Sequence, residues 1–449
     1  MKYIKLFNTH TEYEAFTATT EFIKPNVSHC IQEIEVHYNP IVPPDYSQEY
    51  LTFVAKENGT FQFTDAINYS IDDGTTWTEL AANTDTPTIT SGNKIMWKAT
   101  LTPNSSSGIG RFGSTGNFNV EGNPMSLLFG DDFKGQTSLT GKNYTFYQLF
   151  NNCSKLISAK NLSLPATTLA PNCYSNMFYG CTRLTTAPSV LPATTLANHC
   201  YEGMFSNCTS LTTAPELPAT TLQSYCYQYM FYGCRSLTTA PQLPATRLAN
   251  NCYNNMFRGC TSLTTAPELP ATTLANYCYY HMFYGCTGLT TAPELPATRL
   301  AEGCYQNMFQ GCTSLTTAPQ LPATTLATYC YYYMFYGCTN LTTAPQLPAA
   351  TLATYCYYGM FQGCTSLTTA PQLPATTLQS YCYQYMFYGC TRLNYIKAMF
   401  TTTPSTTYTP NWVSGVASSG TFVKNSAATW DVTGPNGVPE GWTVETASA

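Results

Sequence analysis

Cysteine is the residue with the most potential chemistry, because this 449-residue chain has 20, of which 18 form pairs eight residues apart. Thiols can act as nucleophiles, bind metals or form disulfides. Eight residues of helix span about 12 Å, whereas the Cα atoms of two disulfide-bonded cysteines lie within about 7 Å of each other. A disulfide between the two cysteines of one pair is therefore disfavoured. Zinc sites use other spacings, and only His199 and His281 accompany the paired cysteines. We therefore expect buried free thiols, with no metal and no cofactor.

Two other places could carry chemistry, Asp131-Asp132 and His29-Cys30. The first could be a metal or acid site, but a solvated turn is favoured; the second is favoured as a local structural pair, since adjacent residues rarely meet correctly. The chain contains no Gly-Lys-Ser/Thr phosphate loop, no HExxH and no GxSxG. We expect no catalytic residue and no enzyme, with a hydrolase as a distant third hypothesis.

The cysteine pairs belong to one unit that is written nine times within residues 164–393. One copy runs from Leu217 to Gln242. Successive copies are 27 residues apart once and 26 thereafter, as their first cysteines show: Cys173, Cys200, Cys226, Cys252, Cys278, Cys304, Cys330, Cys356 and Cys382. Such a period is typical of a solenoid, in which each unit buries its apolar face against its neighbours.

Each copy predicts a short helix, a tight turn, a short strand and a return loop. Counted from Cys226, apolar residues at offsets 0, 1, 4 and 5 lie on one face of a helix. Offset 7 is Gly in eight copies and Asn207 in the other, which predicts a left-handed residue that ends the helix. Leu237-Thr-Thr-Ala-Pro241 then suits a brief parallel strand.

The unit resembles the BspA-like leucine-rich repeat family, in which an aromatic residue, a Gly-Cys-like pair, a Leu-x-x-apolar strand and a Leu-Pro recur. The matching residues are Phe231, Gly233-Cys234, Leu237, Ala240 and Leu243-Pro244. The unit differs from the family pattern in three ways: it is longer, it has Ala-Pro where an Ile-x-Leu strand would be usual, and it has a second Cys. The resemblance covers about half of the chain and implies an α/β repeat solenoid, with a short helix and a short parallel strand per unit.

We expect four segments. Residues 1–45 form a head and Pro-rich linker, residues 46–140 a β-sandwich-like domain, residues 141–396 the solenoid with a degenerate first copy, and residues 397–449 a β-rich C-terminal cap. We predict the β-domain from the alternation of apolar residues and from a hairpin turn at Asp73-Gly74. The runs Gly415 to Trp442 and Pro25 to Pro40 resemble the ends of repeat proteins from gut Bacteroidales and their phages.

Charge and hydropathy limit the classes of partner that this chain could bind. Charged residues make up 10% of the chain, and the array has six Arg and five Glu, without the basic stripe of a nucleic-acid-binding protein. No stretch approaches the roughly 18–20 apolar residues of a membrane span. The opening residues lack the apolar run of a secretory signal, so we expect synthesis in the cytoplasm without a signal peptide.

The offsets −1, 2, 3 and 6 differ between copies and carry Tyr, Asn, Gln, Ser, His and Gly, a mixture typical of antibody loops. The candidate ligand-binding residues, expected to form an exposed band, are Tyr225, Tyr229, Tyr277, Tyr280, Tyr329, Tyr332, Tyr333, Tyr355, Tyr358, Tyr381 and Tyr385. Alternatively, these side chains only solubilise a convex face. A ladder of Thr-Thr pairs from Thr186 to Thr369 suits a structural role better than selective recognition.

The sequence thus predicts a non-enzymatic recognition or adhesion protein whose solenoid contacts a bacterial surface glycan or protein. A phage tail or virion-associated receptor-binding component is favoured, which would place the protein on the virion surface. The alternatives are a bacterial cell-surface BspA-like adhesin and a purely structural spacer. Oligomerisation is left open, since no heptad pattern supports a trimer.

Overall fold

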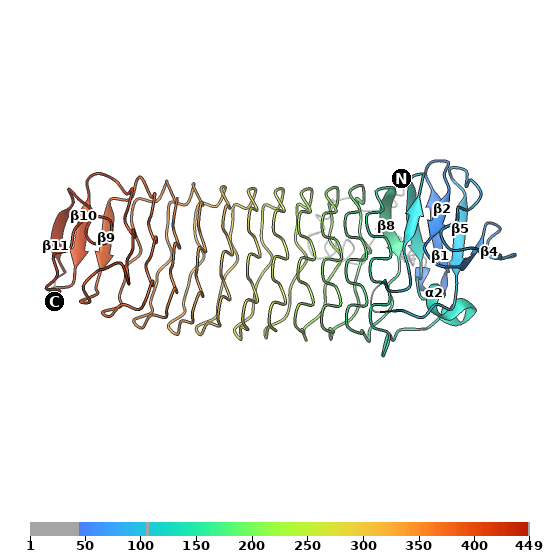
Figure 1. Cartoon of the computed structure of the whole chain (residues 1–449), viewed down its shortest axis with the longest axis horizontal. Helices are drawn as coiled ribbons and strands as arrows, with labels where there is room; N and C mark the ends of the chain where they lie inside the picture. The colour runs from blue at the N-terminus through green and yellow to red at the C-terminus, as the bar shows by residue number, and fades with distance from the viewer. Residues whose placement is uncertain (1–44, 105–106, 448–449) are drawn as a thin grey trace, which may run out of the picture. The chain divides into compact units, whose positions relative to one another are not determined.

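The computed structural model describes residues 45–104 and 107–447. The predicted head, with His29 and Cys30, therefore lies outside the described residues. From Ser47 onward the chain forms one unit, in which a β-rich part is followed by a column of stacked coils (Figure 1). Each copy of the repeat makes one coil.

The β-rich part contains seven strands and three short helical segments. They are η1 (Tyr46–Gln48), β1 (Leu51–Ala55), β2 (Phe61–Phe63), β3 (Ile67–Ser70), β4 (Thr78–Leu80), β5 (Lys94–Lys98), β6 (Phe112–Ser114), β7 (Phe118–Gly122), α2 (Ser126–Phe129) and η2 (Gly130–Phe133). One sheet has the order β4-β3-β5-β1-β7-β8, in which β8 (Leu156–Leu162) comes from the start of the repeat array, and β2 pairs with β6. The predicted hairpin turn joins β3 to β4, with both Asp73 and Gly74 at positive φ.

The alternating apolar residues of these strands face a common core, as the sequence predicts. Phe53 of β1 and Trp97 of β5 are fully buried, and their rings lie 5.4 Å apart. The ring of Phe53 also lies 4.7 Å from that of Phe112 on β6 and 5.3 Å from that of Phe61 on β2. The β2-β6 pair therefore packs against the larger sheet.

Strand β8 (Leu156–Leu162) joins the β-rich part to the coils. It pairs in parallel with β7, and its Ser158 forms a bridge with Thr186 of the next copy. The ring of Phe150, just before β8, stacks on Phe112 at 5.7 Å and on Phe178 at 5.3 Å. One hydrophobic core therefore continues from the sheet into the repeats.

The segment predicted to be a helix is instead a run of tight turns, and residues 164–393 contain no helix. In all nine copies the residues at offsets −1, 3 and 7 are left-handed, with φ between 50° and 73°. An α-helix needs negative φ throughout, so a left-handed residue at every fourth position excludes it. The predicted helix in each unit is therefore wrong, whereas the predicted left-handed residue at offset 7 is confirmed.

Backbone amides in this turn segment, offsets −1 to 8, alternate between two kinds of partner. The N–H of Tyr277 donates to the carbonyl of Glu302 in the next coil at 2.9 Å, while that of Cys278 donates locally to Ala275 at 3.3 Å. The alternation continues through Cys286. The turns therefore satisfy the backbone without a helix, as burial requires.

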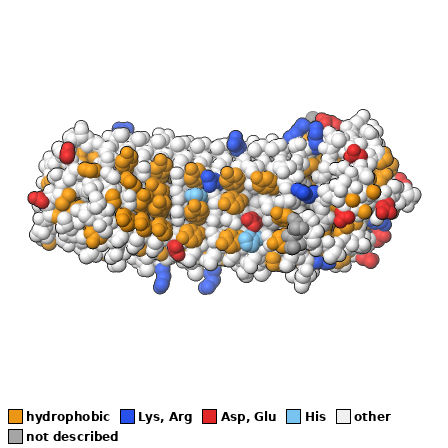
Figure 2. Space-filling view, viewed as in Figure 1, with side chains coloured by type: hydrophobic (Ala, Val, Ile, Leu, Met, Phe, Trp, Pro, Cys, Tyr) orange, Lys and Arg blue, Asp and Glu red, His pale blue; other side chains and the backbone are white. Residues whose placement is uncertain are grey.

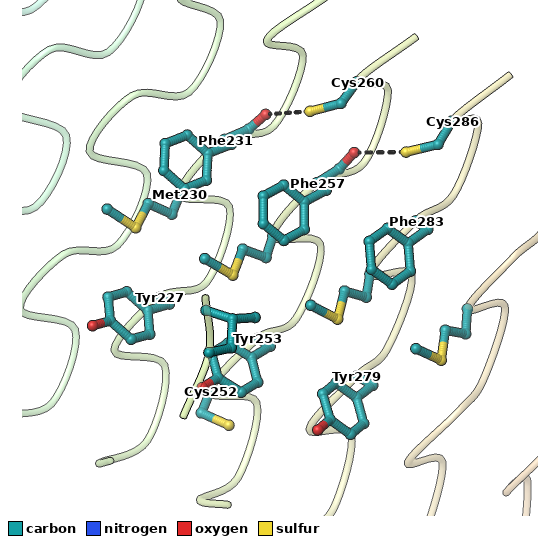
Figure 3. Close-up of a cluster of buried hydrophobic side chains, with 14 of the residues drawn as sticks. Tyr227, Met230, Phe231, Cys252, Tyr253, Phe257, Cys260, Tyr279, Phe283 and Cys286 are labelled. Atoms are coloured by element: carbon teal, nitrogen blue, oxygen red, sulfur yellow. Dashed lines mark hydrogen bonds between the residues drawn. The ribbon is translucent and has the colours of Figure 1, made fainter. Parts of the chain in front are cut away.

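Apolar side chains of the turn segment form continuous buried columns along the array (Figure 3). The ring of Phe283 lies 5.7 Å from Phe257 and 5.6 Å from Phe309, in nearly parallel planes. Tyr253 and Tyr279 stack in the same way at 5.8 Å. Each copy thus buries its apolar face mainly against its two neighbours, as a solenoid requires.

The second cysteine of each copy donates its S–H to a backbone carbonyl of the preceding copy. Figure 3 shows the hydrogen bonds from Cys260 to the Phe231 carbonyl and from Cys286 to the Phe257 carbonyl. Their sulfur–oxygen distances are 3.1 Å and 3.0 Å. All nineteen cysteines in the described part of the chain are buried and unbridged, in agreement with the expected free thiols.

The predicted parallel strand is reduced to single-residue bridges. Thr186, Thr213, Thr239, Thr265 and Thr291 join successive coils in this way. The adjacent threonine adds a side-chain bond in several copies; Thr290 Oγ1, for example, donates to the Thr264 carbonyl at 3.1 Å. The threonine ladder therefore joins the coils to one another.

Regular strands return at the C-terminal end of the column. They are β9 (Tyr395–Ala398), β10 (Thr421–Lys424) and β11 (Thr443–Thr446), which pair in parallel. Trp412 is fully buried near the last Phe of the array, with its ring 6.1 Å from Phe387. Its indole N–H donates to the Gly437 carbonyl at 3.0 Å. The coil geometry therefore continues past the last recognisable copy.

The buried tyrosine column leads to a prediction, because the Tyr253 hydroxyl has no hydrogen-bond partner among the described residues. Tyr253→Phe is expected to raise the free energy of unfolding by about 1 kcal/mol, since it removes an unsatisfied polar group. The stacking on Tyr227 and Tyr279 would remain. Chemical denaturation measures the change, and Tyr336→Phe at the surface is the control. A stability equal to or below that of the parent protein would contradict the prediction.

Candidate functional site

The eleven candidate tyrosines all lie on the turn segments, at offsets −1, 2 and 3. Eight of them occupy left-handed positions with φ between 50° and 60°: Tyr225, Tyr229, Tyr277, Tyr329, Tyr333, Tyr355, Tyr381 and Tyr385. Left-handed backbone is uncommon for a bulky residue and costs roughly 1–2 kcal/mol. The stacking described below offsets part of this cost.

Seven of the eleven candidate tyrosines lie together, and we call them the tyrosine cluster: Tyr329, Tyr332, Tyr333, Tyr355, Tyr358, Tyr381 and Tyr385. Tyr355 stacks between Tyr329 at 4.9 Å and Tyr381 at 5.0 Å, and a second stack pairs Tyr332 with Tyr358 at 4.6 Å. Figure 2 shows the matching patch over the C-terminal copies. The structure therefore brings these seven candidates together.

The expected exposed band is corrected in two respects. Ten of the eleven tyrosines are only half-exposed, several of them because neighbouring rings cover them, and Tyr229 is 37% exposed. The band is also interrupted, since small amides or Gly stand at the corresponding positions of the copies that begin at Cys252 and Cys304. Burial beside Tyr358 raises the pKa of Tyr332 to about 12.

Tyr225 and Tyr229 lie apart from the tyrosine cluster. The ring of Tyr225 stacks on His199 at 4.6 Å, and His199 Nδ1 lies 2.7 Å from a carboxylate oxygen of Glu202. Tyr229 meets Tyr232 edge to face at 5.8 Å. Tyr225 therefore lies beside a charged pair, whereas Tyr229 has an aromatic partner within its own copy.

One residue that the sequence analysis did not select is Arg258, at offset 6. Its guanidinium carbon lies 4.3 Å from the ring centre of Tyr284 and 5.7 Å from that of Tyr232. Its Nη1 donates to Asn255 Oδ1 at 3.2 Å. Burial, with a smaller contribution from Arg258, lowers the pKa of His281 to about 4. The sequence does carry a signal for this contact, because the copies before and after Arg258 have Tyr232 and Tyr284 at the same offset.

A shallow hollow of about 410 Å³ lies beside the tyrosine cluster, and we call it the Gly303 hollow because the ring of Tyr277, which lines it, lies over Gly303. Its lining residues are Asn251, Asn254, Tyr277, Tyr280, Gln306, Tyr329 and Tyr332. A Cβ at Gly303 would clash with the ring of Tyr277, so Gly lets that ring lie across the coil. The hydroxyl of Tyr277 donates to Glu302 Oε1 at 2.8 Å.

The side chains considered for catalysis are held in structural roles. Burial raises the pKa of the Cys226 and Cys278 thiols to about 12, so neither supplies a thiolate near neutral pH. Asp131 accepts hydrogen bonds from the Lys98 ammonium at 2.8 Å and the Tyr50 hydroxyl at 2.6 Å, which lower its pKa. Asp131 is therefore a paired, exposed carboxylate.

Metal-binding clusters and membrane-spanning helices are both absent from the described residues. Residues 45–104 and 107–447 include no group of three or more His, Cys, Asp or Glu able to hold a metal ion. No helix in that same part of the chain is long and apolar enough to cross a bilayer.

The repeats match a family model described as the BspA type leucine rich repeat region, over residues 144–264, 172–316, 228–368 and 280–409. A solved structure of a leucine-rich repeat protein from Bacteroides ovatus is similar at 16% identity and a TM-score of 0.30, covering 67% of this chain and 86% of that chain. A comparison with curated proteins found no match. Since the matched segments span more than half of the sequence, the chain belongs to the BspA-type leucine-rich repeat family.

Proposed function

We propose that the chain is a non-enzymatic recognition protein whose variable turn face binds a glycan or protein on a bacterial surface. The observation that carries the proposal is a contrast within the turn segment. Offsets 0, 1, 4, 5 and 8 are Cys, Tyr, Met, Phe and Cys in all nine copies, and all are buried. The outward offsets carry different residues in different copies. A constant scaffold that displays variable side chains suits recognition.

The displayed side chains are ordered before any ligand arrives. Tyr355, for example, is fixed by its left-handed backbone and by rings on both sides. Ordering of side chains during association costs about 0.5–1.5 kcal/mol for each flexible residue, so an ordered surface reduces that cost. Tyrosine also offers a large contact area with few rotatable bonds.

Within this class we favour a phage tail or virion-associated receptor-binding component over a bacterial adhesin. The support is the resemblance of the segment from Gly415 to Trp442 to the ends of repeat proteins from gut Bacteroidales and their phages. Antibody labelling of purified virions and of intact cells tests the choice. Label on cells but not on particles would favour the adhesin.

The binding proposal is tested with the full chain and a variant carrying Tyr277→Ser, Tyr329→Ser and Tyr355→Ser. Binding to whole Bacteroidales cells and to glycan arrays is expected to fall at least tenfold in the variant, because three ring surfaces are lost from one face. All three positions are left-handed, so the backbone demand on the new serines is the same at each.

The control variant carries Thr239→Ser, Thr265→Ser and Thr291→Ser on the threonine ladder, which keeps each hydroxyl and removes only a methyl group. Its binding is expected to equal that of the parent protein. Circular dichroism of both variants verifies that the fold is retained. Equal binding by the parent and tyrosine variants, or no binding by any of the three, would support the structural spacer instead.

A further inference from the structure

We propose that the Gly303 hollow binds a neutral pyranose ring of a bacterial surface glycan. The proposal rests on the proposed function, because it places a specific site on the same turn face. It adds the location of that site and the chemical class of the ligand.

The hollow lies where two tyrosine stacks begin. Tyr329 stacks on Tyr355 and Tyr332 on Tyr358, so both stacks continue toward the C-terminus. In the preceding copy the corresponding positions are Gly303 and Gln306. Tyr329 and Tyr332 meet each other edge to face at 5.6 Å, and Tyr332 meets Tyr333 in the same way at 4.6 Å. Among the described residues, no ring of the preceding copies stacks on either of them. Two adjacent aromatic faces are thus left open to a ligand.

The opposite wall is formed by Tyr277 and Tyr280, whose rings meet edge to face at 6.0 Å. The hydrogen bond from Tyr277 to Glu302 holds its ring over Gly303. Two coil steps separate Tyr277 from Tyr329, about 10 Å at the usual strand spacing. Burial and the Glu302 hydrogen bond raise the pKa of Tyr277 to about 12, so its hydroxyl stays protonated near neutral pH.

Three amide side chains provide hydrogen bonding between the rings. Asn254 Nδ2 donates to Asn251 Oδ1 at 2.8 Å, which orients that pair. The side chain of Gln306 has no hydrogen-bond partner among the described residues, so its donor and acceptor are both free. Aromatic faces combined with amide groups match a pyranose, which has an apolar C–H face and hydroxyl groups around its edge.

The charge at the rim favours a neutral sugar. The Glu302 carboxylate is fixed there by Tyr277. The nearest cation identified on this face, Arg258, is engaged with Asn255 and the ring of Tyr284. A carboxylate on the ligand would meet the negative charge of Glu302 before any available cation, so the hollow disfavours uronic and sialic acids.

The decisive variant is Gly303→Tyr, which fills the hollow with the residue found at this offset in five other copies. Tyr277 is expected to rotate into the stacked position that Tyr329 adopts beside Tyr355. The matched control is Gly203→Tyr, at an offset that is Tyr in three copies, where the new side chain would meet Asn176 in a part of the array that does not line the hollow. Both variants add one tyrosine to the same face.

The probes are the methyl glycosides of glucose, galactose, mannose and N-acetylglucosamine, with methyl glucuronide and a tyrosine-containing tripeptide for comparison. Saturation-transfer NMR with the full chain is expected to detect at least one neutral glycoside. Gly303→Tyr is expected to reduce its affinity at least tenfold, and Gly203→Tyr to leave it unchanged. Unchanged binding by Gly303→Tyr, no binding of any neutral glycoside, or preference for the glucuronide or the peptide would overturn the proposal.

Whole-cell binding separates this proposal from the broader one. If Gly303→Tyr binds cells as the parent protein does while the three-serine variant does not, the hollow is not the site, although the turn face still recognises the cell. If both variants bind cells like the parent protein, the proposed function fails as well.

Discussion

Raising the pH from 8 to 10 is expected to unfold the repeat array. Burial raises the pKa of Cys278 and of Cys286 to about 12 from an ordinary value of 9.0. Because the folded-state pKa lies above the unfolded-state value, the stabilisation is complete below pH 9 and is lost as the pH rises toward 12. One unit above the unfolded pKa, each thiol lowers the free energy of unfolding by roughly 1.4 kcal/mol. Two thiols in each copy make the effect large.

Circular dichroism and thiol labelling between pH 7 and 12 measure this transition. The control replaces Cys278, Cys286, Cys304 and Cys312 with Ser, which removes four ionisable thiols from adjacent copies. The free energy of unfolding, measured by denaturant titration at each pH, should then fall less steeply with pH in this variant than in the parent protein. An unchanged slope, or labelling of the paired cysteines while the fold is intact, would refute the explanation.

Phe335→Ala is expected to lower the free energy of unfolding by about 3–5 kcal/mol, the usual cost of removing a large ring from a packed core. Phe335 is fully buried and stacks between Phe309 at 5.6 Å and Phe361 at 5.7 Å. The substitution therefore breaks two ring contacts as well as leaving a cavity. Guanidinium denaturation followed by circular dichroism gives the free energy.

The neighbouring residue is a matched control, because Tyr336 belongs to the same turn segment but is 36% exposed. Tyr336→Ala is expected to cost less than about 1 kcal/mol. Similar losses for the two variants would contradict the assignment of Phe335 to the core. A lower denaturant slope in Phe335→Ala would show that the array has separated into two independently unfolding parts.

The core of the repeat could be predicted from the sequence, but its backbone could not. Cys226, Tyr227, Met230 and Phe231 are predicted to be buried and are buried. Their spacing fits a helix of 3.6 residues per turn, but it fits a four-residue period equally well over so short a segment. The apolar residues alone therefore could not separate the two structures.

The outward residues held the missing information. Offsets −1 and 3 include Asn172, Asn176, Gly203, His281 and Gly303, and Asn, His and Gly are the residues most at ease in left-handed backbone. Together with Gly at offset 7 they mark every fourth residue. Tyrosine at the same offsets in other copies obscures this pattern, because its positive φ depends on stacking with neighbouring coils.

The candidate binding face shows the same division. Its phase was predictable, since none of the eleven candidate tyrosines at offsets −1, 2 and 3 is buried. The grouping was not, because the tyrosine cluster and the Gly303 hollow depend on which copies are adjacent. Arg258 was overlooked because its partners, Tyr232 and Tyr284, belong to other copies.

The alternation of backbone amides also has a mechanical consequence. Five backbone hydrogen bonds run from almost every turn segment to the next coil, as they do from Tyr277 to Gly285, and they point along the column. A pull on the C-terminal end would load the outermost coil first and peel it away before its neighbour is strained. Each released copy would add 26 residues, about 90 Å of extended chain. A protein of this construction under tension would lengthen stepwise and absorb work, while the remaining coils kept their ordered turn face.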